Sequence, residues 1–347
     1  MYSHAFVYKN VVYLQSIVIV VYSMRRIFLA CLISVCSLPF LCAQDADAVF
    51  QFLQLPASSH AAALGGDNVS ILEDDVELAY HNPALLTNVG GRMLSLGYMN
   101  YLQRTHTMGA SYAMPVGDRS MLGFKAQYLD FGAMKHTDTG GNVLGDFTAK
   151  DMVMMTMYSF DFSDRLSGGV SGKFIYSNYG QLSSLALGVD LGLNYYDADK
   201  MLSLSVVARN LGGQVKAYDD LQEPLPFNLL VGVSKGLAHA PVRLSLTLTD
   251  LHRWRAEDFY YSGDASWKSL LLKHFIIGAD LFPTASTYVS IGYNFLRHDQ
   301  LKNEARRSIE GLSVGGGIQT QRMRIGVSYG KYHVAASSLM MNFAVAL

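Results

Sequence analysis

Apolar and polar residues alternate with a period of two over most of the chain after residue 91. In TYVSIGYNFL (287–296) large apolar residues alternate with Ser, Gly and Asn, and in PVRLSLTLTD (241–250) Val and Leu alternate with Arg, Ser and Thr. Successive side chains of a β-strand point to opposite faces, so each segment has one apolar face and one small or polar face. The pattern therefore predicts strands, not helices.

The chain contains about fourteen such segments, most of them near the roughly ten residues that a tilted strand needs to cross a bilayer. Their approximate spans are 92–101, 105–114, 120–131, 152–160, 165–178, 182–195, 201–210, 227–235, 242–250, 274–281, 286–296, 311–319, 322–331 and 338–347. A sheet in lipid must close on itself because lipid cannot satisfy an open edge. We therefore expect an all-β fold: a 14-stranded antiparallel transmembrane β-barrel formed by residues 92–347.

The connections between these segments alternate in length. Those after even-numbered segments are short, whereas four that follow odd-numbered segments are long, at 132–151, 211–226, 251–273 and 297–310. Outer-membrane barrels have short periplasmic turns and long outer loops. A soluble β-rich protein is the alternative, but its strands should alternate apolar with charged residues, and here the second face is mostly Ser, Thr, Gly and Asn.

Composition agrees with a membrane barrel. Charged residues make up 16% of the chain and hydrophobic residues 50%, against roughly 25% charged in typical soluble domains. No run of about 18 apolar residues, the length of a membrane helix, follows residue 43. The formal net charge is −1, so there is no global basic field to attract nucleic acid.

The first 43 residues form a separate region. Met24-Arg25-Arg26, an apolar run and a small residue at Ala43 are typical of a cleaved secretory signal. We expect Met24 to be the true start; an N-terminal membrane anchor is the alternative. All three cysteines lie in this region, so a mature chain would have no disulfide, zinc thiolate or cysteine nucleophile. We expect no cofactor and no metal.

Residues 44–91 lack the long alternation and precede the first strand. A barrel of fourteen strands has a lumen too wide for its own side chains to fill, so we expect this segment to plug it. Its glycines allow tight turns, and its Asn-Pro pair ends a short helix or forms a turn. The predicted plug motif consists of Gly65, Gly66, Asp74, Asp75, Asn82, Pro83 and Ala84.

Four acidic residues stand within five positions of this segment: Glu73, Asp74, Asp75 and Glu77. Carboxylates are calcium ligands, but the ordered spacing of a calcium loop is missing. The favoured interpretation is a solvated face or pairing with basic residues of the lumen. The candidate partners are Arg209, Arg243, Arg322 and Arg324.

The segment FLQLPASSHAAALGGDNVSILEDDVELAYHNPALL (52–86) resembles the N-terminal region of the FadL-like outer-membrane proteins of the type IX secretion system, the PorV/PorQ group. ARNLGG (208–213) and PLPFNLLVGVSKGL (224–237) are similar to later strands of the same group. The resemblance implies a fourteen-stranded barrel in a bacterial outer membrane. It also implies a non-enzymatic role: holding a PorZ-like surface protein that assists attachment of secreted cargo to lipopolysaccharide.

One predicted outer loop combines aromatic and basic residues: Trp254, Arg255, Tyr260, Tyr261 and Trp267. Such a mixture is typical of protein-binding hot spots. Trp and Tyr also gather in the aromatic girdle at the lipid headgroups, and the sequence leaves the two interpretations open. We take the five residues as candidate partner-binding residues.

The next predicted outer loop carries Arg297, Lys302, Arg306 and Arg307. These could bind lipopolysaccharide phosphates through charge-assisted hydrogen bonds, or simply be solvated.

GLSVG (311–315) matches the pattern of a hydrolase nucleophile, but that chemistry needs Ser313 on a strand-to-helix turn beside a histidine base. Here a strand pattern surrounds it, so we expect a small-residue strand position and no enzyme.

The main rival to surface anchoring is transport of hydrophobic molecules in the FadL manner. Apolar lumenal residues around the plug would favour transport, whereas exposed aromatic loops and a tightly fixed plug would favour anchoring.

Overall fold

The computed structural model describes residues 48–102, 104–219, 221–259, 266–301, 310–334 and 336–347. All of them belong to the unit Gln44–Leu347. The predicted signal region, 1–43, lies outside the described residues.

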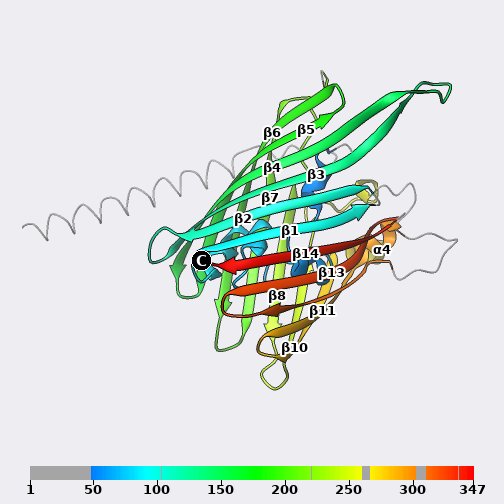
Figure 1. The fold of residues 1–347 in the computed structure, drawn as a ribbon. Helices are drawn as coiled ribbons and strands as arrows, with labels where there is room; N and C mark the ends of the chain where they lie inside the picture. Colours follow the sequence, from blue (N-terminus) through cyan, green and yellow to red (C-terminus); the bar gives the residue numbers. More distant parts are fainter. Residues whose placement is uncertain (1–47, 103, 220, 260–265, 302–309, 335) are drawn as a thin grey trace, which may run out of the picture. The chain divides into compact units, whose positions relative to one another are not determined.

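Fourteen antiparallel strands close into a barrel, each strand pairing with its neighbours in the chain and β1 pairing with β14 (Figure 1). The closing pair runs in register from Met93 opposite Ala346 to Asn100 opposite Leu339. The predicted fold class is therefore confirmed. The strands are β1 Met93–Leu102, β2 Thr105–Pro115, β3 Ser120–Thr137, β4 Val143–Ser163, β5 Leu166–Tyr179, β6 Leu182–Asp197, β7 Leu202–Lys216, β8 Asn228–Gly236, β9 Val242–Leu248, β10 Phe275–Thr284, β11 Thr287–Asn294, β12 Leu312–Gln319, β13 Met323–His333 and β14 Ala336–Ala346.

The two faces of the wall differ as the alternation predicts. Large apolar side chains such as Leu96, Met108 and Ile291 are exposed on the outside, whereas the side chains between them face inward and are often small or polar, like Ser95 and Ser290. An outward apolar face around a closed barrel is the arrangement that lipid requires. Among the described residues, no helix is long and apolar enough to cross a bilayer.

The N-terminal residues 48–91, here called the plug segment, form short helical turns that pack against the inner face of the wall. They are η2 Gln51–Gln54, α2 Ser59–Ala63, η3 Val76–Tyr80 and η4 Pro83–Asn88. Ser58 caps α2, Asp75 caps η3 and Asn82 caps η4, each through its side chain. These caps satisfy helix-end N–H groups away from water. Nearly every side chain of α2, η3 and η4 is buried.

The wall is uneven in height, which the sequence does not indicate. Strand β4 has 21 residues and β9 has 7, and β3 and β4 extend together as a long hairpin (Figure 1). The predicted loop 132–151 is therefore wrong over most of its length. Both faces of this hairpin extension are largely exposed, and its apolar residues do not alternate with polar ones, since Val143 and Leu144 are adjacent and both exposed.

Two other predicted loops contain helices. Helix α3, Trp267–Lys273, and the 3-10 helix η5, Glu257–Phe259, lie between β9 and β10, and helix α4, Phe295–Leu301, follows β11. Lys273 at the end of α3 forms an ion pair of 2.7 Å with Asp299 in α4. The two outer connections are thereby joined to each other.

Candidate functional site: the plug segment and its lumen

Acidic residues of the plug segment pair with basic residues of the barrel wall. Asp74 lies 2.5 Å from Arg324 of β13, and Glu73 lies 2.6 Å from Arg243 of β9. Two further pairs complete the set: Asp67 with Arg209 of β7, and Glu77 with Lys125 of β3. Pairing of the predicted acidic cluster with Arg243 and Arg324 is thus confirmed. Arg209 pairs with Asp67, which lies outside that cluster. Arg322 is exposed in the turn before β13 and pairs with none of these acids in the described part of the plug segment.

The most enclosed of these contacts is a four-residue network around His60, which is 2% exposed. Its Nδ1 lies 2.8 Å from Glu73 Oε2 and its Nε2 lies 2.8 Å from Asp280 Oδ1. Arg243 bridges the same two carboxylates, and Tyr288 stacks on the imidazole at 4.0 Å. Two carboxylates facing two potential cations make a neutral cluster when His60 is protonated.

Burial and the neighbouring charges shift the pKa values of this network in opposite directions. Burial alone lowers the pKa of His60, but the Glu73 and Asp280 carboxylates outweigh it and raise the pKa to about 9. Burial alone raises the pKa of Glu73, but His60 and Arg243 lower it to about 2. At neutral pH the cluster therefore contains an imidazolium and a carboxylate.

Asp75 differs from its acidic neighbours because its carboxylate forms no ion pair within the described part of the chain. It accepts hydrogen bonds from the Glu77 N–H at 2.9 Å and from the Ser58 hydroxyl at 3.3 Å. Burial, and then the nearby Glu77 carboxylate, raise its pKa to about 6. Its role in the structure is that of a helix cap.

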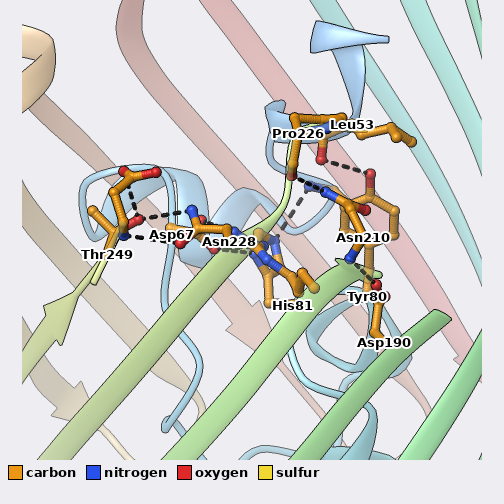
Figure 2. Close-up of polar contacts among 12 residues, drawn as sticks. Leu53, Asp67, Tyr80, His81, Asp190, Asn210, Pro226, Asn228 and Thr249 are labelled. Carbon is orange, nitrogen blue, oxygen red and sulfur yellow. Dashed lines mark hydrogen bonds and ion pairs between the residues drawn. The ribbon is translucent and has the colours of Figure 1, made fainter. Parts of the chain in front are cut away.

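A second cluster holds the middle of the plug segment against β7 (Figure 2). Asp67 accepts two hydrogen bonds from Arg209 and lies 2.8 Å from His81 Nδ1. Burial would raise the pKa of Asp67, but Arg209 and His81 keep it well below its usual range. Burial lowers the pKa of His81, so this imidazole is neutral at pH 7.

The Asn82-Pro83-Ala84 turn fits against glycines of the wall. Asn82 accepts from the Ala84 N–H at 3.0 Å and donates to the Val69 carbonyl at 2.8 Å. A Cβ at Gly169 of β5 or Gly192 of β6 would collide with Pro83 or Asn82. The turn therefore lies directly on the wall, and its conformation is fixed from both sides.

The double glycine seats the plug segment against the opposite part of the wall. Gly65 and Gly66 have φ values of 108° and 101°, which favour glycine because it has no Cβ. Asn294 of β11 donates to the Gly65 carbonyl at 3.2 Å. A Cβ on Gly292 of the same strand would collide with the backbone of Leu64.

Toward the outer end of the barrel, part of the lumen is apolar. Phe50, Phe52, Leu53 and Leu55 of the plug segment pack in one buried cluster with residues of the wall and of the β7–β8 connection. The plug segment is tied to that connection by a hydrogen bond of 3.1 Å from the Val49 N–H to the Pro224 carbonyl. We call the part of this cluster outside the plug segment the apolar collar: Leu129, Val153, Ile175, Ala186 and Leu225.

Nearly every side chain of α2, η3 and η4 is buried against the wall. Two small cavities between the plug segment and the wall measure about 10 and 30 Å³, the size of one or two water molecules. The segment and the wall are therefore in close contact, and passage of a larger molecule needs part of the segment to move.

The described members of the predicted partner-binding set between β9 and β10 are Trp254, Arg255 and Trp267, and all three are exposed. Trp254 is 52% exposed, and its ring is tilted against that of His274 with centroids 4.3 Å apart, while Trp267 at the start of α3 is 68% exposed. Arg255 is exposed beside Asp258. Tyr260, Tyr261, Arg306 and Arg307 lie outside the described residues.

Arg297 is placed differently from the prediction. Its guanidinium stacks on Tyr332 at 3.9 Å and donates to Ser313 at 3.4 Å, and a Cβ on Gly66 would collide with it. Helix α4 starts directly after β11 and turns the chain over the lumen, so this arginine faces the plug segment. Ser313 itself lies within β12, as predicted.

Sequence reasoning does not single out Lys125, Asp280, His60 or Tyr288. A signal exists for Lys125 and Asp280, because each is a charged residue at an inward-facing position of a membrane strand. Such positions are functional or structural by default. His60 has no comparable signal in its Ala-rich surroundings.

No protein-family model matches the chain, and no curated protein matches it significantly. Among solved structures, the chain is similar to the toluene transporter TodX of Pseudomonas putida, with a TM-score of 0.54 and 12% identity over 84% of this chain and 97% of that chain. It is also similar to the monoaromatic hydrocarbon channel CymD, with a TM-score of 0.51 and 12% identity over 86% and 97% of the two chains. The chain has the fold of these two barrels. Closed barrels with an apolar outer face are the form that proteins take in bacterial outer membranes, and the chain is an outer-membrane barrel.

Proposed function

We propose that the protein passes small hydrophobic molecules across the outer membrane, with the plug segment as its hatch. The observation that carries this proposal is the apolar collar, since a water-filled pore would have a polar lining. The two similar structures, a toluene transporter and a monoaromatic hydrocarbon channel, support it at the level of the fold.

In this proposal the outer part of the plug segment moves and the inner part stays. Residues 50–55 are held chiefly by apolar contacts, whereas the rest is held by the ion pairs with β3, β7, β9 and β13. Phe50 has a φ of 58° and a ψ of 41°, a left-handed conformation that costs a non-glycine residue about 1 kcal/mol or more. The strained residue, Phe50, therefore lies in the outer part of the plug segment, which moves in this proposal.

Uptake of radiolabelled toluene into proteoliposomes whose outer leaflet is lipopolysaccharide, which slows passage of toluene through the bilayer itself, tests the proposal. Changing Phe52 to Ala removes about 2 kcal/mol of burial, which corresponds to roughly a thirtyfold larger open population. We expect faster uptake than with the unchanged protein. Phe174→Ala, at an exposed position of β5, is the matched control and should leave uptake unchanged. Uptake no faster than in protein-free liposomes, with both variants folded, would rule out transport.

The second candidate function is anchoring of a surface protein in a type IX secretion system, as in PorQ-like barrels. The specific observation in its favour is the exposure of Trp254 and Trp267 on outer connections. The fixed inner part of the plug segment also suits a barrel that does not open.

Mass spectrometry of proteins and lipids that co-purify from native outer membranes separates the two functions. Anchoring predicts a stoichiometric surface protein that is lost when Trp254 and Trp267 are both changed to Ala. The control is Leu221→Ala, which alters an exposed residue of a different outer connection. Recovery of hydrophobic molecules without a protein partner would support transport instead.

A further inference from the structure

An unpaired carboxylate lies beside the apolar collar. Asp151 of β4 is 2% exposed, and its Oδ1 has no hydrogen-bond partner among the described residues. Its Oδ2 accepts a hydrogen bond of 3.0 Å from the Tyr179 hydroxyl. Within the same part of the chain, no lysine, arginine or histidine forms an ion pair with it.

Other inward-facing carboxylates of the wall have cations beside them. Asp280 faces Arg243 and His60, and Asp190 lies 2.8 Å from Lys173. A buried carboxylate without a partner is costly, because it loses hydration and gains no compensating charge. Among the described residues of the lumen, Asp280 and Asp190 thus have a cation beside them, whereas Asp151 has none.

Asp151 is placed to meet whatever occupies the collar. Its backbone pairs with Leu129 of β3, a collar residue, on one side and with Ser177 of β5 on the other. The ring of Tyr179, whose hydroxyl binds Asp151, lies 5.8 Å from Phe131 and 5.5 Å from Tyr218, measured between centroids. The carboxylate therefore stands between the collar and a group of aromatic rings.

The plug segment fills the apolar part of this region but not its polar part. Phe50 reaches Tyr218, with ring centroids 6.2 Å apart, and contributes no hydrogen-bond donor from its side chain. The region around Asp151 therefore suits the apolar part of a bound molecule, while Asp151 Oδ1 has no hydrogen-bond donor among the described residues.

We infer that the molecule taken up in the collar carries a hydrogen-bond donor, by preference a cationic amine, on an apolar or aromatic body. This deepens the proposed transport function and rests on it. The ammonium group replaces the missing cation at Asp151, and the tyrosine rings around it add cation–π contacts. A molecule with a carboxylate head group is excluded by repulsion from Asp151, and a pure hydrocarbon leaves its Oδ1 unpaired.

Binding of three probes with the same chain but different head groups tests the inference: octylamine, 1-octanol and octanoate. Calorimetry is done at pH 7.4 on the full protein in lipid nanodiscs, with Phe50→Ala as the background that opens space beside Tyr218. Partition of each probe into protein-free nanodiscs is measured and subtracted, so that the three probes can be compared. We expect octylamine to bind most tightly and octanoate least.

The isosteric change Asp151→Asn should weaken octylamine binding by about ten- to a hundredfold, the worth of one charge-assisted hydrogen bond. It should change octanol binding much less. Asp146→Asn, at an exposed position of the same strand, is the matched control. Tyr179→Phe provides a second variant: it frees the other oxygen of Asp151, so octylamine binding should be kept or strengthened, whereas a merely structural role predicts loss.

The outcomes separate this inference from the function on which it rests. Equal binding of octylamine and octanoate, or no effect of Asp151→Asn, would overturn the inference while leaving transport of hydrophobic molecules intact. No binding of any probe to the Phe50→Ala protein would overturn both.

Discussion

Deprotonation of His60 should loosen the plug segment at alkaline pH. The imidazole is enclosed by Glu73, Asp280, Arg243 and Tyr288. When His60 loses its proton, the two carboxylates retain only the Arg243 charge, and the cluster acquires a net negative charge away from water. Ions of the solvent cannot easily compensate this charge, since the site is buried.

The magnitude follows from the rise of the His60 pKa from 6.5 to about 9 on folding. A tenfold change in proton affinity corresponds to about 1.36 kcal/mol, so protonation of His60 contributes on the order of 3 kcal/mol to the folded state. Because the pKa is raised on folding, this contribution is complete below pH 6.5 and is lost as the pH rises through 9.

Unfolding of the detergent-solubilised protein in denaturant, followed at pH 6.5, 7.5, 8.5 and 9.5, measures this loss. The free energy of unfolding should fall by about 3 kcal/mol over the range in the unchanged protein. His60→Gln removes the titrating group and should flatten the profile. If both proteins show the same slope, other groups titrate in this range and the reasoning about His60 is wrong.

Two further changes test the contacts of the plug segment. Gly292→Ala places a Cβ in the backbone of Leu64, so we expect protease access to the plug segment, whereas Gly172→Ala, which meets no atom within 4 Å, should leave the segment protected. Lys125→Met leaves Glu77 buried and unpaired, which should lower the free energy of unfolding by about 3–5 kcal/mol. The double variant with Glu77→Gln should regain most of that loss, and an additive double-mutant cycle would argue against the pair.

The period of two is enough to predict the barrel, because a membrane wall repeats one physical requirement along the whole chain. Every strand needs an apolar outer face, and no loop satisfies that pattern. The same signal fails where β3 and β4 extend beyond their predicted ends, since both faces are largely exposed there and apolar and polar residues do not alternate. The period-of-two alternation reports contact with lipid, so it does not predict the parts of strands that extend into water.

The candidate site is predictable in part. An acidic cluster ahead of a barrel with lumenal arginines predicts pairing, and two of the four candidate arginines, Arg243 and Arg324, are paired with acids of that cluster. Which acid meets which cation depends on strand tilt and register, which the sequence does not state. Arg297 is a residue whose contacts the sequence does not predict. Its sequence context is that of a solvated loop, but the turn into α4 directs its side chain onto Tyr332.

The charge pairs that hold the plug segment also determine which signals from outside the cell can reach it. Salt weakens exposed pairs but screens buried ones little, and the carboxylates and cations at Asp67, Glu73 and Glu77 are largely enclosed. Brackish or fresh surroundings therefore leave the hatch in place. Protons act differently from salt, because loss of a proton from a group such as His60 changes the net charge of the cluster, whereas salt only screens the attraction between its charges. The barrel is thus insensitive to salinity but responsive to alkalinity.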